Sequence, residues 1–214
     1  MSRTVHEEHR DEEDIKSSGS GACTSLTVWR KSLLFSCNGF TVIDSDGNLV
    51  YRVDNYIGGQ RPQEVILMDG LGKTVLTIHR RPKKLRLQDN WLVYEGEVGD
   101  CCNINATTKP SKEPIWCVRK HINILHNANC SLLAHVFRGT SSDKRHAYVI
   151  EGSYAHRSCK VLDESRKVVA EIKRKEAMIG GISFGVEVFL LIVWPGFDRG
   201  FAMALVLLLD QMFS

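Results

Sequence analysis

The densest group of basic side chains in the sequence is the run His79-Arg80-Arg81-Pro82-Lys83-Lys84-Leu85-Arg86. A Lys ammonium acts as a compact point charge, and an Arg guanidinium can bind two oxygens of one phosphate group at once. Such a run after a predicted strand is typical of a surface that binds anionic headgroups. The sequence therefore predicts a lipid- or phosphate-binding surface made by Arg80, Arg81, Lys83, Lys84 and Arg86.

Two further basic groups could extend this surface. They are Arg119-Lys120 and Lys173-Arg174-Lys175. The same run also fits a solvated hairpin whose charges keep a sheet edge from pairing with other chains. It fits a nuclear-localisation signal as well. The residues alone leave these three interpretations open.

Patterns for metal binding and catalysis are incomplete or missing. Asp44-x-Asp46-Gly47-Asn48 resembles the start of a calcium loop, but the Glu that should end such a loop is absent, so we interpret it as a hairpin turn. His121, His126 and Cys130 lack the second ligand cluster of a zinc site. There is no G-x-S-x-G, P-loop, dinucleotide fingerprint or H-E-x-x-H motif. We therefore expect a non-enzymatic protein without catalytic residues, metal or cofactor.

The cysteines and the N-terminus favour a reducing compartment. The chain has seven cysteines, an odd number, and no C-x-x-C pair. No apolar signal-peptide region follows Met1. We therefore expect reduced thiols in a cytoplasmic protein, located peripherally at the plasma membrane, in the nucleus, or in both.

Charge is distributed unevenly between the N-terminal segment and the rest of the chain. Residues 1–22 contain six acids and three bases, whereas the whole chain carries a net charge of +3. Residues 23–214 therefore carry 25 bases (28 minus 3) and 19 acids (25 minus 6), a net charge of +6. Because the first segment has few large apolar side chains, we expect 1–22 to be a disordered acidic tail and 23–214 to be one folded domain.

Period-two apolar patterns separated by turns predict a mainly β domain. Three units share one plan: a strand, a turn that begins with Asp, and a second strand. The turns begin at Asp44, Asp69 and Asp163. Six residues on, each unit has a valine, and nine residues on a β-branched residue. Strand candidates are 26–30, 40–43, 49–53, 65–68, 74–78, 85–87, 91–97, 115–120, 132–137, 148–154, 159–162, 168–172 and 185–194.

The C-terminal segment Phe201–Phe213 is apolar at nearly every position and predicts a helix with Asp198 as its N-cap. A surface helix would show a polar face, so this one must be enclosed. About twelve strands would form a barrel too wide to be filled by strand side chains alone. We therefore predict a closed antiparallel β-barrel with the helix in its centre. The core-helix residues are Phe201, Leu205, Leu207, Leu208, Leu209 and Met212.

The alternative for this segment is a membrane anchor. Residues 188–209 have the length of a membrane span, but Pro195, Asp198 and Arg199 lie near the middle. Each charge would cost about 2.5–3.5 kcal/mol at the bilayer centre. We therefore expect no transmembrane span.

Several ordered motifs resemble the plant LURP-one-related proteins over about residues 24–213. They are Trp29-Arg30-Lys31-Ser32-Leu33-Leu34-Phe35, Asn38-Gly39-Phe40-Thr41-Val42, Asp54-Asn55-Tyr56, Leu67-Met68-Asp69, Pro195-Gly196-Phe197-Asp198 and Leu208-Leu209-Asp210-Gln211-Met212. That family is similar to the C-terminal domain of tubby proteins and to phospholipid scramblases. The resemblance implies a twelve-stranded barrel around a hydrophobic C-terminal helix, with no established catalytic residues.

The resemblance also implies a plant protein, defence signalling, and kinship with membrane-tethered transcription factors. Tubby-like domains hold phosphoinositides with Lys and Arg, which favours a peripheral module that binds anionic lipid. A nuclear DNA-associated regulator and a scramblase-like membrane protein are the alternatives. We expect a monomer that does not bind nucleic acid, because no helix is left free to enter a groove.

Overall fold

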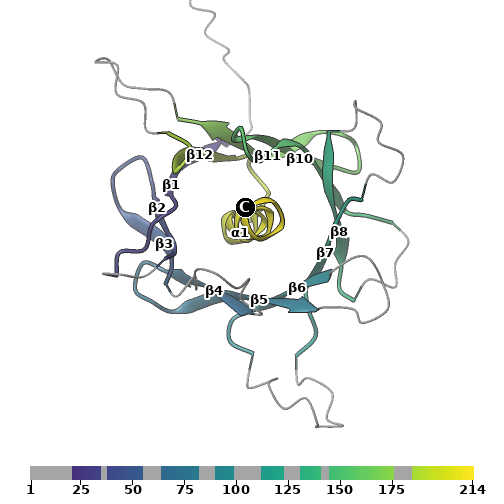
Figure 1. The fold of residues 1–214 in the computed structure, drawn as a ribbon, viewed down its shortest axis with the longest axis horizontal. Coiled ribbons are helices and arrows are strands. Elements are labelled where there is room, and N and C mark those ends of the chain that lie inside the picture. The colour runs from purple at the N-terminus through teal and green to yellow at the C-terminus, as the bar shows by residue number, and fades with distance from the viewer. Residues whose placement is uncertain are drawn as a thin grey trace, which may run out of the picture.

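The computed structural model describes residues 21–34, 38–54, 64–81, 90–98, 112–122, 131–140, 145–175 and 185–214. These residues form twelve strands and one helix (Figure 1). The strands are β1 (Thr24–Trp29), β2 (Phe40–Ile43), β3 (Leu49–Val53), β4 (Glu64–Asp69), β5 (Thr74–Arg81), β6 (Asn90–Glu95), β7 (Trp116–Lys120), β8 (Leu132–Arg138), β9 (Tyr148–Ser153), β10 (Ser158–Asp163), β11 (Val168–Arg174) and β12 (Val188–Val193). The helix is α1 (Arg199–Phe213).

The strands form one closed antiparallel barrel in which every strand pairs with its neighbour along the chain. The ring closes where β1 pairs with β12, from Thr24 opposite Val193 to Trp29 opposite Val188. Figure 1 looks down the barrel axis and shows α1 inside the ring. Both the predicted closed barrel and its central helix are therefore confirmed.

The three predicted Asp hairpins form and have the same construction. In each one the Asp carboxylate accepts a hydrogen bond from the backbone N–H four residues on, at Asn48, Lys73 and Lys167. The residue three positions on has a positive φ: 86° at Gly47, 90° at Gly72 and 64° at Arg166. Glycine adopts this conformation without steric cost, whereas arginine does not. The bidentate contact of Arg166 with Glu151 accompanies the strained third turn.

The valine shared by the three units lies at a β-bulge. The pairing register shifts between Leu49 and Tyr51, between Thr74 and Leu76, and between Val168 and Ala170. The skipped positions are the valines at 50, 75 and 169, so each hairpin has one extra residue in its second strand. The β-branched residues nine positions after each Asp are buried in the core.

Helix α1 forms the central part of the hydrophobic core. The Asp198 carboxylate accepts a hydrogen bond from the Phe201 N–H at 2.6 Å and so caps the helix, as predicted. Residues from Gly200 to Met212 are all buried. At the first turn Phe201 stacks on Trp116, with 4.6 Å between ring centroids. The predicted core-helix residues Phe201, Leu205, Leu207, Leu208, Leu209 and Met212 are at most 3% exposed.

Most strand boundaries differ by one to three residues from the sequence prediction. The difference that concerns function is in β5, which continues through Arg81 instead of ending at Ile78. Arg80 and Arg81 therefore lie within a strand and do not follow one. The candidate 85–87 lies outside the described residues, as do residues 1–20 of the predicted tail. Within the described ranges, no helix combines the length and apolar character needed to cross a bilayer.

Candidate anion-binding surface

The two ends of the barrel differ in composition because the chain alternates direction from strand to strand. One end carries the three Asp hairpins and the start of α1, and we call it the hairpin face. The other end carries the last residues of β1, β3, β5, β7, β9 and β11, together with the end of α1. We call this second end the C-terminal face. The site residues predicted from sequence that the structure describes all lie at the C-terminal face.

The alternation of side chains along a strand divides the predicted residues between the interior and the exterior of the barrel. Arg80 lies opposite Trp91, which is 2% exposed and belongs to the core, so Arg80 is on the inward side of β5. Arg81 lies opposite Asn90, is exposed, and faces outward. Lys83, Lys84 and Arg86 lie outside the described residues. The structure therefore shows Arg80 and Arg81 on opposite sides of the sheet.

Arg119 and Lys120 are divided in the same way. Arg119 also pairs with Asn90 in register, so Arg81 and Arg119 lie on either side of this residue on the outer face. The Arg119 guanidinium carbon lies 4.7 Å from the centre of the Phe137 ring. Lys120 faces inward, where its Nζ donates to the Met212 carbonyl at 2.8 Å. Lys120 thus caps the negative end of the helix dipole, a structural role that the sequence did not reveal.

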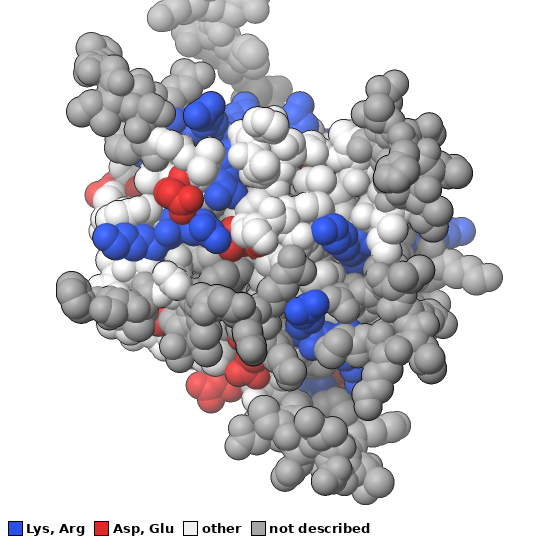
Figure 2. All heavy atoms as spheres, in the orientation of Figure 1, with Lys and Arg blue, Asp and Glu red and all other residues white. Residues whose placement is uncertain are grey.

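Basic residues collect at the C-terminal face, where the structure adds Arg30 and Lys31 to the basic residues predicted from the sequence. Arg30 follows β1, Arg174 ends β11, and both lie on the inward side of their strands. Figure 2 looks onto this end of the barrel, where Lys and Arg side chains are more numerous than acidic ones among the coloured residues. We call this set the basic rim. It comprises Arg30, Lys31, Arg80, Arg81, Arg119, Lys173, Arg174 and Lys175.

The acidic side chains that the described residues place at this face each contact a basic side chain. Asp54 contacts Arg52 at 2.7 Å, and Glu64 contacts His79. Glu187 and Asp210 both contact Arg30. Arg30 is shared by two of these acids, and the rim member Lys173 lies 3.2 Å from Glu171. Basic side chains still outnumber acidic ones among the described residues of this face. An anionic partner would therefore find a net attractive surface at this end.

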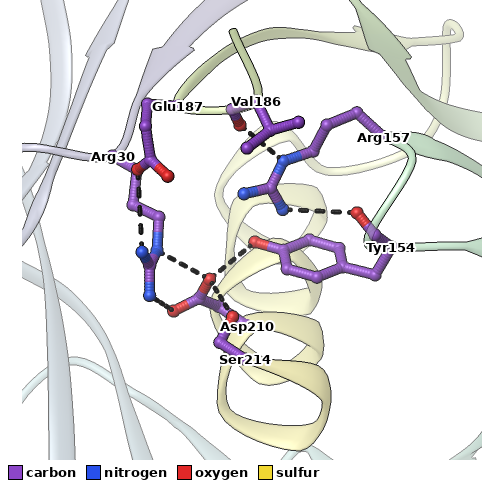
Figure 3. Close-up of polar contacts among 7 residues, drawn as sticks. All are labelled: Arg30, Tyr154, Arg157, Val186, Glu187, Asp210 and Ser214. Carbon is purple, nitrogen blue, oxygen red and sulfur yellow. Dashed lines mark hydrogen bonds and ion pairs between the residues drawn. The ribbon is translucent and has the colours of Figure 1, made fainter.

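Asp210 lies at the centre of a polar cluster that attaches the end of α1 to the barrel (Figure 3). Its side chain is fully buried and accepts from Arg30 Nε at 2.9 Å, from the Tyr154 hydroxyl at 3.0 Å and from the Ser214 hydroxyl at 2.8 Å. Burial by itself favours the neutral forms of Tyr154 and Arg30. It raises the pKa of Tyr154 well above its usual value, and the Asp210 charge adds to this shift. For Arg30, the attraction of Asp210 outweighs the lowering caused by burial, and the pKa rises.

Arg157 forms the neighbouring part of this cluster. It is 5% exposed, and its guanidinium lies 4.1 Å from the Tyr154 ring centre and 4.5 Å from that of Phe189. Its Nε donates to the Val186 carbonyl at 2.7 Å. Arg157 therefore joins the β9–β10 turn to the residues before β12. Arg157 and Asp210 use their charges to hold the structure together, which distinguishes them from the exposed rim residues.

The turn at Asp44 is a hairpin and shows no sign of an ion site. The Asp44 carboxylate accepts from the N–H groups of Asp46 and Asn48 and from the Asn48 side chain. Those hydrogen bonds lower the pKa of Asp44, with the bonds from Asn48 contributing most. Across the described ranges, no group of three or more His, Cys, Asp or Glu side chains is arranged to hold a metal ion. Of the zinc candidates, His126 and Cys130 lie outside those ranges.

Comparison with known proteins assigns the chain to a family. The LURP-one-related family profile matches residues 24–210. Protein LURP-one-related 17 from Arabidopsis thaliana is 54% identical over 197 residues, which cover 91% of this chain and 85% of that protein. Protein LURP-one-related 8 from the same plant is 47% identical over 196 residues, covering 91% and 89%.

The chain belongs to the LURP-one-related family. A crystal structure of an Arabidopsis thaliana protein resembles this LURP-one-related chain with a TM-score of 0.57 and 24% identity, covering 88% of this chain and 90% of that one. At this identity the likeness concerns the fold alone. The family resemblance, the plant origin and the tubby-like barrel fold expected from the sequence are confirmed.

Three thiols of this LURP-one-related protein are described, and all are free. Cys23 is exposed, whereas Cys117 and Cys159 are buried. Burial raises the pKa of Cys159 to about 12, so its thiol stays protonated at neutral pH. Because thiolates are the reactive form, Cys159 is chemically inert in the folded protein.

Three histidines meet on the outer wall beside the basic rim. The His135 ring lies 5.7 Å from His121 and 5.3 Å from His146, measured between ring centroids. Its Nδ1 is buried without a hydrogen-bond partner in the structure. Burial lowers the pKa of His135 below the usual histidine value of 6.5, and positive charge on His146, His121 and Arg119 lowers it further. The folded protein therefore resists protonation at this position.

We expect this LURP-one-related protein to lose stability as the pH falls below about 6.5, partly because of His135. A depressed histidine pKa means that the unfolded chain binds the proton first, so stability present above pH 6.5 is lost as the pH falls towards the folded pKa. His135→Gln should flatten the decline in denaturation midpoint between pH 7 and 5, measured by circular dichroism. An unchanged pH dependence in this variant would contradict the assignment.

The Asp210 cluster was not predicted from the sequence, although the sequence contains one signal for it. Asp210 interrupts an otherwise apolar helix, and a buried carboxylate requires a cationic or hydrogen-bonding partner. Arg30 is 180 positions away, and only the closure of β1 on β12 brings it near the end of α1. The choice of Arg30 and Tyr154 as partners thus depends on topology that spacing alone does not reveal.

Proposed function

We propose that this LURP-one-related protein is a non-enzymatic module that binds anionic phospholipid headgroups, phosphoinositides above all, during plant defence signalling. The observation that carries the proposal is the basic rim at the C-terminal face, where Asp54, Glu187 and Asp210 are engaged in ion pairs and Glu64 is hydrogen-bonded to His79. Lys and Arg near an anionic membrane surface each contribute about 1 kcal/mol to binding. Because the basic rim contains Lys and Arg side chains from several strands, their summed contributions can bind the protein to an anionic membrane without a deep pocket.

The buried helix supports this proposal over a DNA-associated regulator. A typical DNA-binding module places a helix or β-ribbon in a groove and reads base edges with a few side chains. Among the described residues, α1 is the single helix, and it is buried from Gly200 to Met212. The outer face of the barrel remains available for contacts with phosphate. The proposed location is the cytoplasm, with peripheral binding at the plasma membrane.

We expect neutralisation of exposed rim charges to weaken vesicle binding. Arg81 and Arg174 are exposed, end strands β5 and β11 on opposite sides of the ring, and do not join the Asp210 cluster. Arg81→Ala combined with Arg174→Ala should reduce binding to phosphoinositide vesicles roughly thirtyfold, because two surface cations are lost. Lys83→Ala with Lys84→Ala and Arg86→Ala tests the rest of the predicted run. Sedimentation with vesicles of increasing phosphoinositide content measures the effect.

The matched control removes two charges from the opposite end of the barrel. Lys73 and Lys167 are exposed in the Asp turns of the hairpin face. Lys73→Ala combined with Lys167→Ala lowers the net charge equally and should leave vesicle binding within about twofold of the wild type. Equal losses in both double variants, or equal pelleting by neutral lipid, would contradict binding by the rim. Binding should also fall as salt rises.

A further inference from the structure

Large apolar side chains are exposed at the C-terminal face. Five of them lie beside the basic rim: Trp29 at 39% exposure, Leu33 at 53%, Leu34 at 47%, Ile122 at 41% and Val186 at 41%. Trp29 ends β1, Ile122 follows β7, and Val186 precedes β12. Because β7 lies across the ring from β1 and β12 (Figure 1), these side chains border the face from opposite sides.

The segment that carries Trp29, Leu33 and Leu34 is held in place by hydrogen bonds. The Ser32 hydroxyl donates to Asp54 at 2.8 Å and accepts from the Leu34 N–H at 3.0 Å. The Lys31 carbonyl accepts from the Thr41 hydroxyl at 2.7 Å. Ser32 is 5% exposed, whereas the leucines that follow it are about half exposed. The backbone is therefore anchored in a geometry that directs these two leucines towards solvent.

Basic and apolar groups alternate within this segment. Lys31 Nζ lies 5.4 Å from the centre of the Trp29 ring. The Arg30 N–H donates to the Glu187 carbonyl at 2.8 Å, which places the segment beside Val186. Amphipathic aromatic rings and leucines flanked by Lys and Arg are typical of the layer between lipid headgroups and acyl chains. A purely polar ligand site would not need the exposed apolar side chains, and a dry protein interface would not need the flanking Lys and Arg.

We infer that the C-terminal face seats on an anionic bilayer, with Trp29, Leu33 and Leu34 entering the headgroup layer while the basic rim contacts lipid phosphates. This inference rests on the proposed function and names its partner as a lipid surface, in contrast to a free inositol phosphate. The charge of the rim supplies the complementarity to anionic lipid. The placement of the apolar side chains on both sides of the ring suits an extended, nearly planar partner better than a single peptide in a groove.

Two measurements test the insertion directly. Leu33→Asp combined with Leu34→Asp should weaken binding to vesicles of phosphatidylcholine, phosphatidylserine and phosphoinositide about tenfold or more, because apolar burial is replaced by like-charge repulsion. Lipids brominated on the acyl chain should quench Trp29 fluorescence on binding. The Trp29→Phe variant should lose most of this quenching, since Trp91 is buried in the barrel and Trp116 and Trp194 lie at the hairpin face, at the start of β7 and just after β12.

Leu71→Asp is the matched control for the leucine variants. Leu71 is 96% exposed in the turn of the hairpin face, so Leu71→Asp adds one negative charge away from the proposed contact, the same charge as Leu33→Asp or Leu34→Asp alone. Each single leucine variant is therefore compared with it, as well as the double variant. Leu71→Asp should leave vesicle binding within about twofold of the wild type. Soluble inositol phosphate, at the same concentration as the vesicle headgroups, should compete only weakly with vesicles for the protein, because it has no apolar layer for the leucines and Trp29 to enter.

The outcomes separate this inference from the proposed function. If the wild-type protein fails to bind anionic vesicles, both are overturned. If it binds, but the two leucine substitutions act no more strongly than Leu71→Asp and brominated lipid leaves the fluorescence unchanged, the insertion is overturned and headgroup binding stands. Complete competition by soluble inositol phosphate would also overturn the insertion. Selective loss in the leucine variants together with quenching that depends on Trp29 would establish it.

Discussion

Leu207→Asp is expected to unfold the whole domain instead of producing a local defect. Leu207 is fully buried in α1, at the centre of the barrel core. Truncation of a core leucine alone costs about 2–5 kcal/mol. An unpaired carboxylate in the same place adds several kcal/mol, and the domain as a whole has a stability of about 5–15 kcal/mol. The sum is comparable with the entire stability.

The measurement for Leu207→Asp is far- and near-ultraviolet circular dichroism of the purified variant, with size-exclusion chromatography. We expect loss of the native near-ultraviolet signal and aggregation. Leu71→Asp provides the comparison, because Leu71 is 96% exposed in a hairpin turn and should tolerate the charge. A folded, monodisperse Leu207→Asp protein would show that α1 does not form the core.

Asp210→Ala is expected to destabilise the domain by about 3 kcal/mol. The substitution removes the buried and closer of the two carboxylates that contact Arg30, leaving only Glu187 at 3.6 Å, and it leaves the buried Tyr154 hydroxyl without its acceptor. Breaking a buried ion pair costs about 3–5 kcal/mol, and the partial exposure of Arg30 places this case near the lower end. The loss should appear as a lower denaturation midpoint with an unchanged denaturant slope.

A double-mutant cycle with Arg30→Ala separates the pair from general loss of packing. If Arg30 and Asp210 interact as the geometry indicates, the double variant should be more stable than the sum of the single losses predicts, by about 1 kcal/mol or more. Independent effects of the two substitutions would mean that the contact contributes little. Asp210→Asn keeps an acceptor for Tyr154 and should lose less stability than Asp210→Ala.

The elements of this fold were predictable because their local signals agree with their tertiary roles. The three Asp turns at residues 44, 69 and 163 combine a side-chain cap with flanking period-two patterns, and both are properties of adjacent residues. The absence of a polar face on α1 required an enclosure, and the number of strands indicated one of suitable width. The β-bulges at the shared valines were not predicted, because a register shift shows only when two strands are aligned.

The candidate surface was only partly predictable. The run that begins at Arg80 signals a basic surface, but its sequence does not show that β5 extends to Arg81 and turns the two arginines to opposite sides. Lys120 was assigned to the same surface, although it caps the end of α1. The contribution of Arg30 depends on the closure of the barrel, which joins the two ends of the domain.

Hydrogen exchange with and without phosphoinositide vesicles tests the central claim most directly, because it reports on the buried helix and the docking face in one experiment. The amides of α1 should stay strongly protected in both states, as expected for a helix enclosed by the barrel. Added protection on vesicles should appear at residues 29–34 and 119–122, with none at the hairpin turns 44–48 and 69–73. Loss of protection in α1 on vesicles, or new protection confined to the hairpin face, would contradict the account.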